Sequence, residues 1–164
     1  MRILGIDPGT ATTGYGLVSS TLQGGLETID FGVIETPAGI PLEKRLLLLY
    51  RRLKELMILH LPDGAAVEKI FFQRNVKTAI SVSQARGVIL LALAESDLKI
   101  GEYTPLEIKL AVAGYGGADK NQMQQMVRAI LGLPEIPRPD DAADALAIAI
   151  CHINSTHVYN EILG

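Results

Sequence analysis

Four acidic residues of this chain adjoin apolar segments, from which their carboxylates could meet in one site. Asp7 closes an N-terminal apolar run, and Glu68 ends a second one. Asp141 and Asp144 stand three residues apart at the start of an apolar helical pattern, so both side chains share one helix face. Carboxylate oxygens are the ligands that Mg²⁺ prefers. The four acids therefore predict a site for hard divalent cations, which can promote phosphoryl transfer without a protein nucleophile.

Each acid also has a simpler explanation. Asp7 could shape an Asp-Pro-Gly turn. Asp141 could cap the final helix and Asp144 could supply a favourable first-turn charge, although Asp140 is the more natural cap. Glu68 fits a purely structural role less well, because a carboxylate within an apolar strand costs free energy unless a partner compensates it. One shared site explains all four acids more simply than four separate roles.

Composition places the chain among globular proteins. Its 164 residues suffice for one domain with a substantial core, and 48% are hydrophobic against 20% charged. Cys151 is the only cysteine, which excludes an internal disulfide and a cysteine-rich zinc cluster. The sequence shows no secretion-signal pattern and no uninterrupted apolar run of about 18 residues. We therefore expect a soluble, cytoplasmic, single-domain protein with no membrane partner.

The charge distribution leaves a nucleic-acid partner open. A net charge of −3 and a pI of about 5.6 argue weakly against DNA binding, because phosphate backbones select basic surfaces. Basic residues nevertheless gather in one segment and on both sides of Glu68. The first group comprises Lys44, Arg45, Arg51, Arg52 and Lys54, and the second comprises Lys69, Arg74, Lys77 and Arg86. Such groups fit either solvated helix faces or a DNA-facing surface.

The first half of the chain predicts three strands and a helix. Branched apolar side chains indicate a central strand over residues 2–7. Strands over 14–20 and 26–36, joined by a hairpin turn at Gln23-Gly-Gly, complete an antiparallel meander. Apolar positions at helical spacing predict an amphipathic helix over 42–60.

The second half alternates strands and helices. A strand from Gly64 ends near Glu68, a helix spans 78–95, and a strand spans 100–103. Short helices follow over 105–112 and from a capping box at 119–122 to about residue 131, and the last helix starts at Asp141. The helix over 78–95 is apolar almost all round, which suggests a subunit interface. This order predicts an α/β fold with a mixed sheet flanked by helices.

Several motifs together resemble the RuvC Holliday-junction resolvases. They are Ile6-Asp-Pro-Gly-Thr with Thr13-Gly-Tyr-Gly, Val67-Glu68 followed by Phe71, Gln84-Ala-Arg-Gly, and Asp141-Ala-Ala-Asp-Ala-Leu-Ala-Ile-Ala. The resemblance spans nearly the whole chain with the motifs in the family's order. It implies a single ribonuclease H-like nuclease domain over residues 1–164. The expected five-stranded sheet has three antiparallel strands followed by parallel ones.

The resemblance also implies an activity. The family resolves four-way DNA junctions in recombination and repair, as a homodimer that makes paired symmetric incisions. We expect metal-dependent phosphodiester hydrolysis with two Mg²⁺ ions per subunit, or Mn²⁺ in their place, leaving 5′-phosphate and 3′-hydroxyl ends. Junction DNA and the branch-migration proteins RuvA and RuvB are the implied partners.

Site residues carry over from the family motif by motif. Asp7, Glu68, Asp141 and Asp144 become catalytic metal ligands, with Asp7 bridging both ions, and Lys120 a catalytic lysine near the scissile phosphate. The implied DNA-binding residues are Phe71, Phe72, Arg74, Asn75, Lys77 and Lys109. An aromatic at position 71 could stack on an unpaired base, a contact worth about 1 to 3 kcal/mol. An ordinary core phenylalanine is the alternative.

Two other functions compete with this interpretation. The Asp-Pro-Gly-Thr turn with a glycine-rich hairpin also resembles the phosphate loop of actin-like ATPases, which bind nucleotide between two lobes. This chain supplies only one lobe. A non-catalytic junction-binding module is the other alternative, and the presence of all four acids disfavours it.

Overall fold

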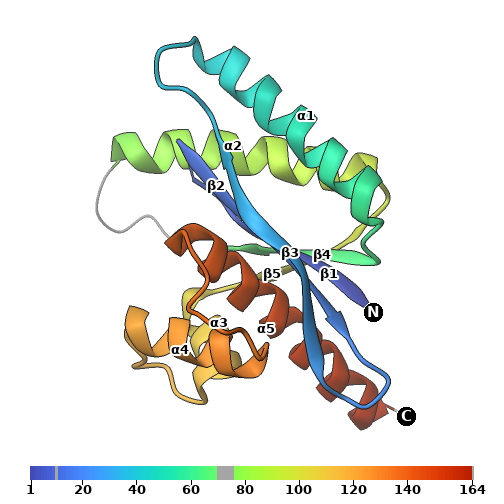
Figure 1. Cartoon of the computed structure of the whole chain (residues 1–164). Coiled ribbons are helices and arrows are strands. Elements are labelled where there is room, and N and C mark those ends of the chain that lie inside the picture. The colour runs from blue at the N-terminus through green and yellow to red at the C-terminus, as the bar shows by residue number, and fades with distance from the viewer. Residues whose placement is uncertain (10, 70–75, 164) are drawn as a thin grey trace.

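The computed structural model describes residues 1–9, 11–69 and 76–163, which form a mixed five-stranded sheet between two layers of helices (Figure 1). The strands are β1 (Arg2–Asp7), β2 (Thr12–Ser20), β3 (Leu26–Glu35), β4 (Gly64–Glu68) and β5 (Lys99–Tyr103), in the order β3-β2-β1-β4-β5. β1 pairs antiparallel with β2 and parallel with β4. The predicted fold class and the central place of the first strand are confirmed.

Helices cover both faces of this sheet (Figure 1). α1 (Leu42–His60) and α2 (Val76–Glu95) lie on one face. α5 (Asp140–Leu163) lies on the other, with α3 (Pro105–Ala113) and α4 (Lys120–Ile130) packed beside it. The helix predicted over 78–95 begins two residues earlier than expected, and the final helix begins at Asp140.

The alternation of side chains along β1 determines which face carries Asp7. Leu4 and Ile6 are fully buried among the residues of α1 and α2, whereas Ile3 is buried against α5. Because successive side chains point to opposite faces of a sheet, Asp7 projects toward α5. Val67 faces α2 for the same reason, so the next residue of β4 also projects toward α5.

Three glycines let α5 lie directly on the sheet. A Cβ atom at Gly5 would collide with a backbone carbonyl of α5, and one at Gly14 would collide with the carbonyl of Asp141. A Cβ at Gly16 would lie 2.7 Å from the backbone nitrogen of Leu146. Glycine in a strand commonly marks such a close backbone approach. The glycines of β1 and β2 thus bring the first turns of α5 above the end of β1.

Capping residues fix the starts of the two short helices. Asp119 accepts a hydrogen bond from the backbone N–H of Gln122, whose side chain accepts one from the backbone N–H of Asp119 in return. This is the predicted capping box. Thr104 and Glu107 form a second one at α3. The cap at Asp119 makes Lys120 the first residue of α4.

α2 is partly buried and partly exposed. Ala85, Ile89 and Leu93 pack into the core, while Ile80 is 54% exposed and Leu91 is 62% exposed. By length and composition alone, Thr78–Glu95 could cross a membrane, as the core helix of a soluble protein often could. Only 22% of this segment is buried in the described structure, and its buried side chains pack in the cluster shared with α1 and the sheet.

Candidate active site

Three acidic side chains converge where β1 ends and α5 begins. Asp7 is the last residue of β1, and Asp141 and Asp144 lie in the first turns of α5. One carboxylate oxygen from each lies within 4.8 Å of one from each of the others. Residues more than 130 positions apart in the sequence therefore meet in one place, because α5 packs against β1.

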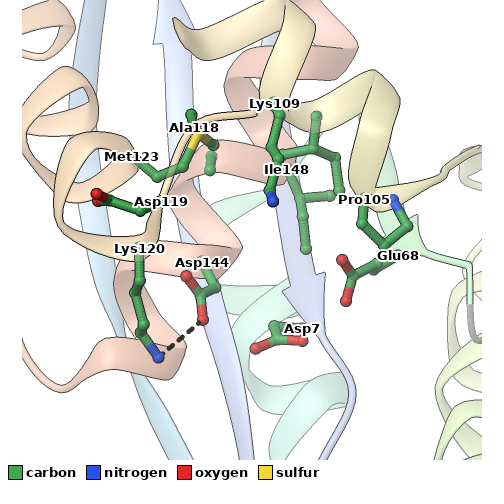
Figure 2. A pocket seen from close by; sticks show the side chains of 12 residues that line it. Asp7, Glu68, Pro105, Lys109, Ala118, Asp119, Lys120, Met123, Asp144 and Ile148 are labelled. Atoms are coloured by element: carbon green, nitrogen blue, oxygen red, sulfur yellow. Dashed lines mark ion pairs between the residues drawn. The ribbon is translucent and has the colours of Figure 1, made fainter. Parts of the chain in front are cut away.

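Glu68 borders the same site from β4. It lines one pocket together with Asp7 and Asp144, and Figure 2 shows all three side chains around this pocket. Glu68 is not among the three acids whose oxygens lie within 4.8 Å of one another. The structure thus brings together three of the predicted ligands and places the fourth at the edge of their cluster.

Burial and neighbouring negative charge disfavour the ionised forms of Asp7, Glu68 and Asp144. Burial, followed by the negative charges of Glu68, Asp144 and Asp141, raises the pKa of Asp7 to about 8. Burial and the charge of Asp144 raise the pKa of Glu68 to about 6. Burial also raises the pKa of Asp144, which Lys120 partly opposes. All donor atoms here are carboxylate oxygens, so the site fits a hard divalent cation that would neutralise the repulsion.

Lys120 places a positive charge beside this cluster. Its Nζ atom lies 3.1 Å from Oδ2 of Asp140 and 3.7 Å from Oδ2 of Asp144. The hydrogen bond to Asp140 is the main cause that raises the pKa of Lys120 above its ordinary value. The ammonium group therefore stays charged throughout the neutral range.

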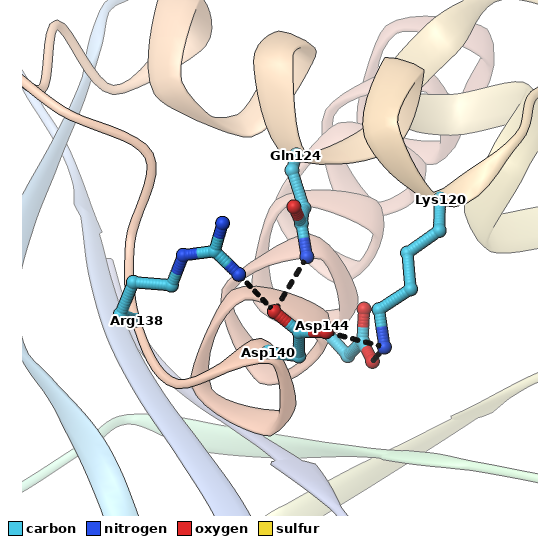
Figure 3. A network of polar contacts seen from close by, with 5 residues as sticks. All are labelled: Lys120, Gln124, Arg138, Asp140 and Asp144. Atoms are coloured by element: carbon cyan, nitrogen blue, oxygen red, sulfur yellow. Dashed lines mark hydrogen bonds and ion pairs between the residues drawn. The ribbon is translucent and has the colours of Figure 1, made fainter.

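Asp140 is a member of this site that the sequence interpretation missed. The expectation that Asp140 caps α5 is wrong, because it is the first residue of the helix and its side chain bonds outside it (Figure 3). Oδ1 of Asp140 accepts hydrogen bonds from Nε2 of Gln124 at 3.0 Å and from Nη1 of Arg138 at 2.6 Å. Gln124 is only 6% exposed. One sequence signal pointed to this contact. Lys120 and Gln124 are four residues apart, so both lie on one face of α4 and can reach the same carboxylate.

The pocket beside the acids has a volume of about 250 Å³. Asp7, Glu68 and Asp144 line it together with two basic residues, Lys109 of α3 and Lys120 of α4 (Figure 2). Apolar side chains, including Ile108 and Met123, complete the lining. An acidic centre with basic residues at its margin suits a phosphate diester that must approach bound cations.

The other predicted DNA contacts fall outside the described residues. These are Phe71, Phe72, Arg74 and Asn75. The side chain of Lys77, in the first turn of α2, is also not described. These five residues stay predictions, whereas Lys109 lines the pocket as reported above.

Comparisons with known proteins assign the family. The model of the family "Crossover junction endodeoxyribonuclease RuvC" matches residues 3–152. A Chloroflexus aurantiacus protein with that name is 62% identical over 152 residues, covering 93% of this chain and 92% of the relative. The solved structure of Thermus thermophilus RuvC superposes with a TM-score of 0.90 at 36% identity, covering 97% of each chain. A second T. thermophilus RuvC structure, in complex with Holliday junction substrate, gives a TM-score of 0.88 at 34% identity over 96% of each chain.

The match extends over nearly the whole chain and includes the strand ends and the helix that carry the acids. The TM-scores show that the overall fold agrees with that of the two solved relatives. On this evidence the chain, with its ribonuclease H-like fold, belongs to the RuvC family of crossover junction endodeoxyribonucleases.

Proposed function

We propose that this protein is a structure-specific endonuclease that resolves four-way DNA junctions by paired symmetric incisions in recombination and repair. The convergence of Asp7, Asp141 and Asp144 into one cluster carries the proposal. Membership of the RuvC family supports the reaction class, and the relative in complex with Holliday junction substrate supports the substrate class.

The cluster can hold divalent cations through carboxylate oxygens alone. Asp7 lies between the acids of α5 and Glu68, which makes it the candidate bridging ligand. Divalent cations held there would supply activation of an attacking water and stabilisation of the leaving oxygen of a phosphodiester, and cleavage would give 5′-phosphate and 3′-hydroxyl ends. The oxygen-only donor set favours Mg²⁺, with Mn²⁺ as a substitute. The number of two ions per subunit follows from the family resemblance.

Two lysines complete the site from neighbouring helices. Lys120, held by Asp140 and Asp144, keeps a positive charge beside the cluster, where it can stabilise negative charge that develops on the phosphate. Lys109 lines the same pocket from α3 and can contact the DNA backbone. In both roles, the packing of α3 and α4 places the lysine side chain beside the acids.

The decisive test compares the wild-type protein with Asp7→Asn on a synthetic four-way junction and on duplex DNA. We expect the wild type to make symmetric nicks in the junction only, and only with a divalent metal. Asp7→Asn should abolish cleavage and leave junction binding largely intact. Glu27→Gln, which changes an exposed acid on β3, is the matched control.

Three outcomes would contradict the proposal. Full activity of Asp7→Asn would exclude a metal-dependent mechanism at this cluster, and binding without cleavage by the wild type would favour a non-catalytic module. Binding of ATP would favour the ATPase alternative.

We further propose that α2 forms the homodimer contact. The exposed side chains of Ile80 and Leu91 are apolar and belong to one helix, whereas Leu90 packs partly against the core. Leu91→Glu should therefore produce monomers in sedimentation experiments and eliminate paired incisions. Leu22→Glu, at a fully exposed leucine of the β2–β3 hairpin, should leave the dimer intact. An unchanged dimer for Leu91→Glu would exclude this interface.

The cellular setting rests on family membership alone. We propose a cytoplasmic protein that acts with RuvA and RuvB on the same junctions. Co-purification of the three proteins on junction DNA tests the partnership, and cell fractionation tests the location.

A further inference from the structure

The end of β4, which carries Glu68, has sheet support on one side only. Pairing of β1 with β4 ends at Ile6 and Val67, so Glu68 lies beyond it. The chain continues from β1 into Pro8, which has no N–H to extend the ladder. On the other side, Glu68 pairs with Tyr103 of β5, and the N–H of Lys69 donates to the carbonyl of Tyr103 at 2.8 Å.

Arg86 reaches this strand end from the opposite face of the sheet. Its Nε atom donates a hydrogen bond to the backbone carbonyl of Glu68 at 3.3 Å. Its Nη2 atom forms an ion pair with the carboxylate of Glu102 on β5. The Arg86 side chain is 20% exposed and that of Glu102 is 41% exposed, so the bond to the Glu68 carbonyl is the more sheltered of the two contacts. One guanidinium therefore connects α2 to the ends of β4 and β5.

We propose that Arg86 is a positioning residue for the metal site. By holding the Glu68 carbonyl, it fixes the backbone from which the Glu68 carboxylate projects toward Asp7 and Asp144. The catalytic consequence rests on the proposed function, whereas the effect on cation binding does not. Removing residues that orient metal ligands typically costs about 10- to 100-fold in metal affinity or activity.

The chemistry of the contact requires arginine in particular. The planar guanidinium presents several N–H donors at fixed angles, so it can bond a carbonyl and a carboxylate at once. Lysine has a compact charge on a flexible stem, so Arg86→Lys should keep the attraction to Glu102 without fixing the Glu68 carbonyl. Glu102→Gln should weaken the hold on Arg86 while it preserves side-chain volume.

The test measures cation binding and cleavage separately. Mn²⁺ titration by calorimetry without DNA reports the site, and single-turnover cleavage at saturating junction reports catalysis. For Arg86→Ala we expect about 10- to 100-fold weaker Mn²⁺ binding and a comparably slower cleavage step, with junction affinity and dimer mass unchanged. Arg86→Lys and Glu102→Gln should fall between this variant and the wild type. Arg128→Ala, which removes an exposed arginine of α4 whose Nε donates to the carbonyl of Leu133, should match the wild type.

Each outcome decides the role of Arg86. Wild-type Mn²⁺ affinity and cleavage rate in Arg86→Ala would overturn the proposal, as would a cleavage defect fully explained by weaker junction binding or by loss of the dimer. If Arg86→Ala does not fold, wild-type values in both Arg86→Lys and Glu102→Gln would overturn it. Weaker Mn²⁺ binding in the variants of a protein that cuts no junction would support the positioning role and refute the proposed function.

Discussion

Replacing Asp7 with asparagine should stabilise the metal-free protein, increasingly so as the pH rises. The pKa of Asp7 is raised from 3.8 to about 8 in the folded protein. Between these values the folded state holds a proton that the unfolded chain has lost, so stability falls as the pH rises through this window. An asparagine side chain has no proton to lose and carries no charge. The variant therefore lacks the loss of stability that the ionisation of buried Asp7 causes in the wild type.

The magnitude follows from the two pKa values. At about 1.4 kcal/mol for each pKa unit, the destabilisation by Asp7 approaches an upper limit of about 6 kcal/mol as the pH rises past the folded-state pKa of about 8. Small domains have a total stability of about 5 to 15 kcal/mol, so this is a large share. Relief of even about 2 kcal/mol would raise the Tm of a domain of this size by about 4 to 8 °C.

Thermal unfolding followed by circular dichroism measures this effect. Wild type, Asp7→Asn and the exposed-acid control Glu27→Gln would be compared with EDTA at about pH 5 and about pH 8, then with excess Mg²⁺. We expect the advantage of Asp7→Asn to widen with pH in EDTA, and Mg²⁺ to stabilise the wild type more than the variant. A variant no more stable than the wild type at the higher pH would refute the conclusion that burial and neighbouring charge disfavour ionised Asp7.

Three further predictions concern the same site. Gly14→Ala forces a methyl group against the backbone of α5 and should lower stability by about 1 to 3 kcal/mol, whereas Gly39→Ala, in open space, should not lower the Tm. Lys120→Gln should slow cleavage about 100-fold at saturating junction, and an unchanged single-turnover rate would exclude a catalytic role. Apparent Mg²⁺ affinity should rise from about pH 6 to about pH 8, because Asp7 and Glu68 must lose protons to bind the ion; a pH-independent titration would contradict this.

The sequence allowed the main elements and three of the clustered acids to be predicted because the signals are local. A branched apolar run ending in Asp7 indicates a buried strand with an acid at its end. The spacing of Asp141 and Asp144 puts both on one helix face. The distance between Asp7 and the two acids of α5 depends on the packing of α5 against β1, which is a long-range contact. Gly14 and Gly16 permit that contact, but a glycine in a strand does not identify which helix lies on it.

Asp140 escaped prediction for the same physical reason. Its sequence position, just before an apolar helix, fits a cap, and capping is a local interaction. In the structure its carboxylate instead bonds side chains 16 and 20 residues earlier, those of Gln124 and Lys120. Arg86 likewise looked like one basic residue among several near Glu68. Only the packing of α2 against the sheet reveals its contact with the strand end.

The proposed metal site is held from both faces of one sheet. Glycines of β1 and β2 let α5 carry two acids onto one face, and Arg86 fixes the Glu68 backbone from the other. Burial, and after it the negative charges of the neighbouring acids, raises the pKa of Asp7, so the metal-free cluster depends on these supports and not on attraction among ionised ligands. Substitutions at the supports should therefore weaken cation binding while every ligand remains in place. Substitutions at the ligands should weaken it while making the metal-free fold more stable.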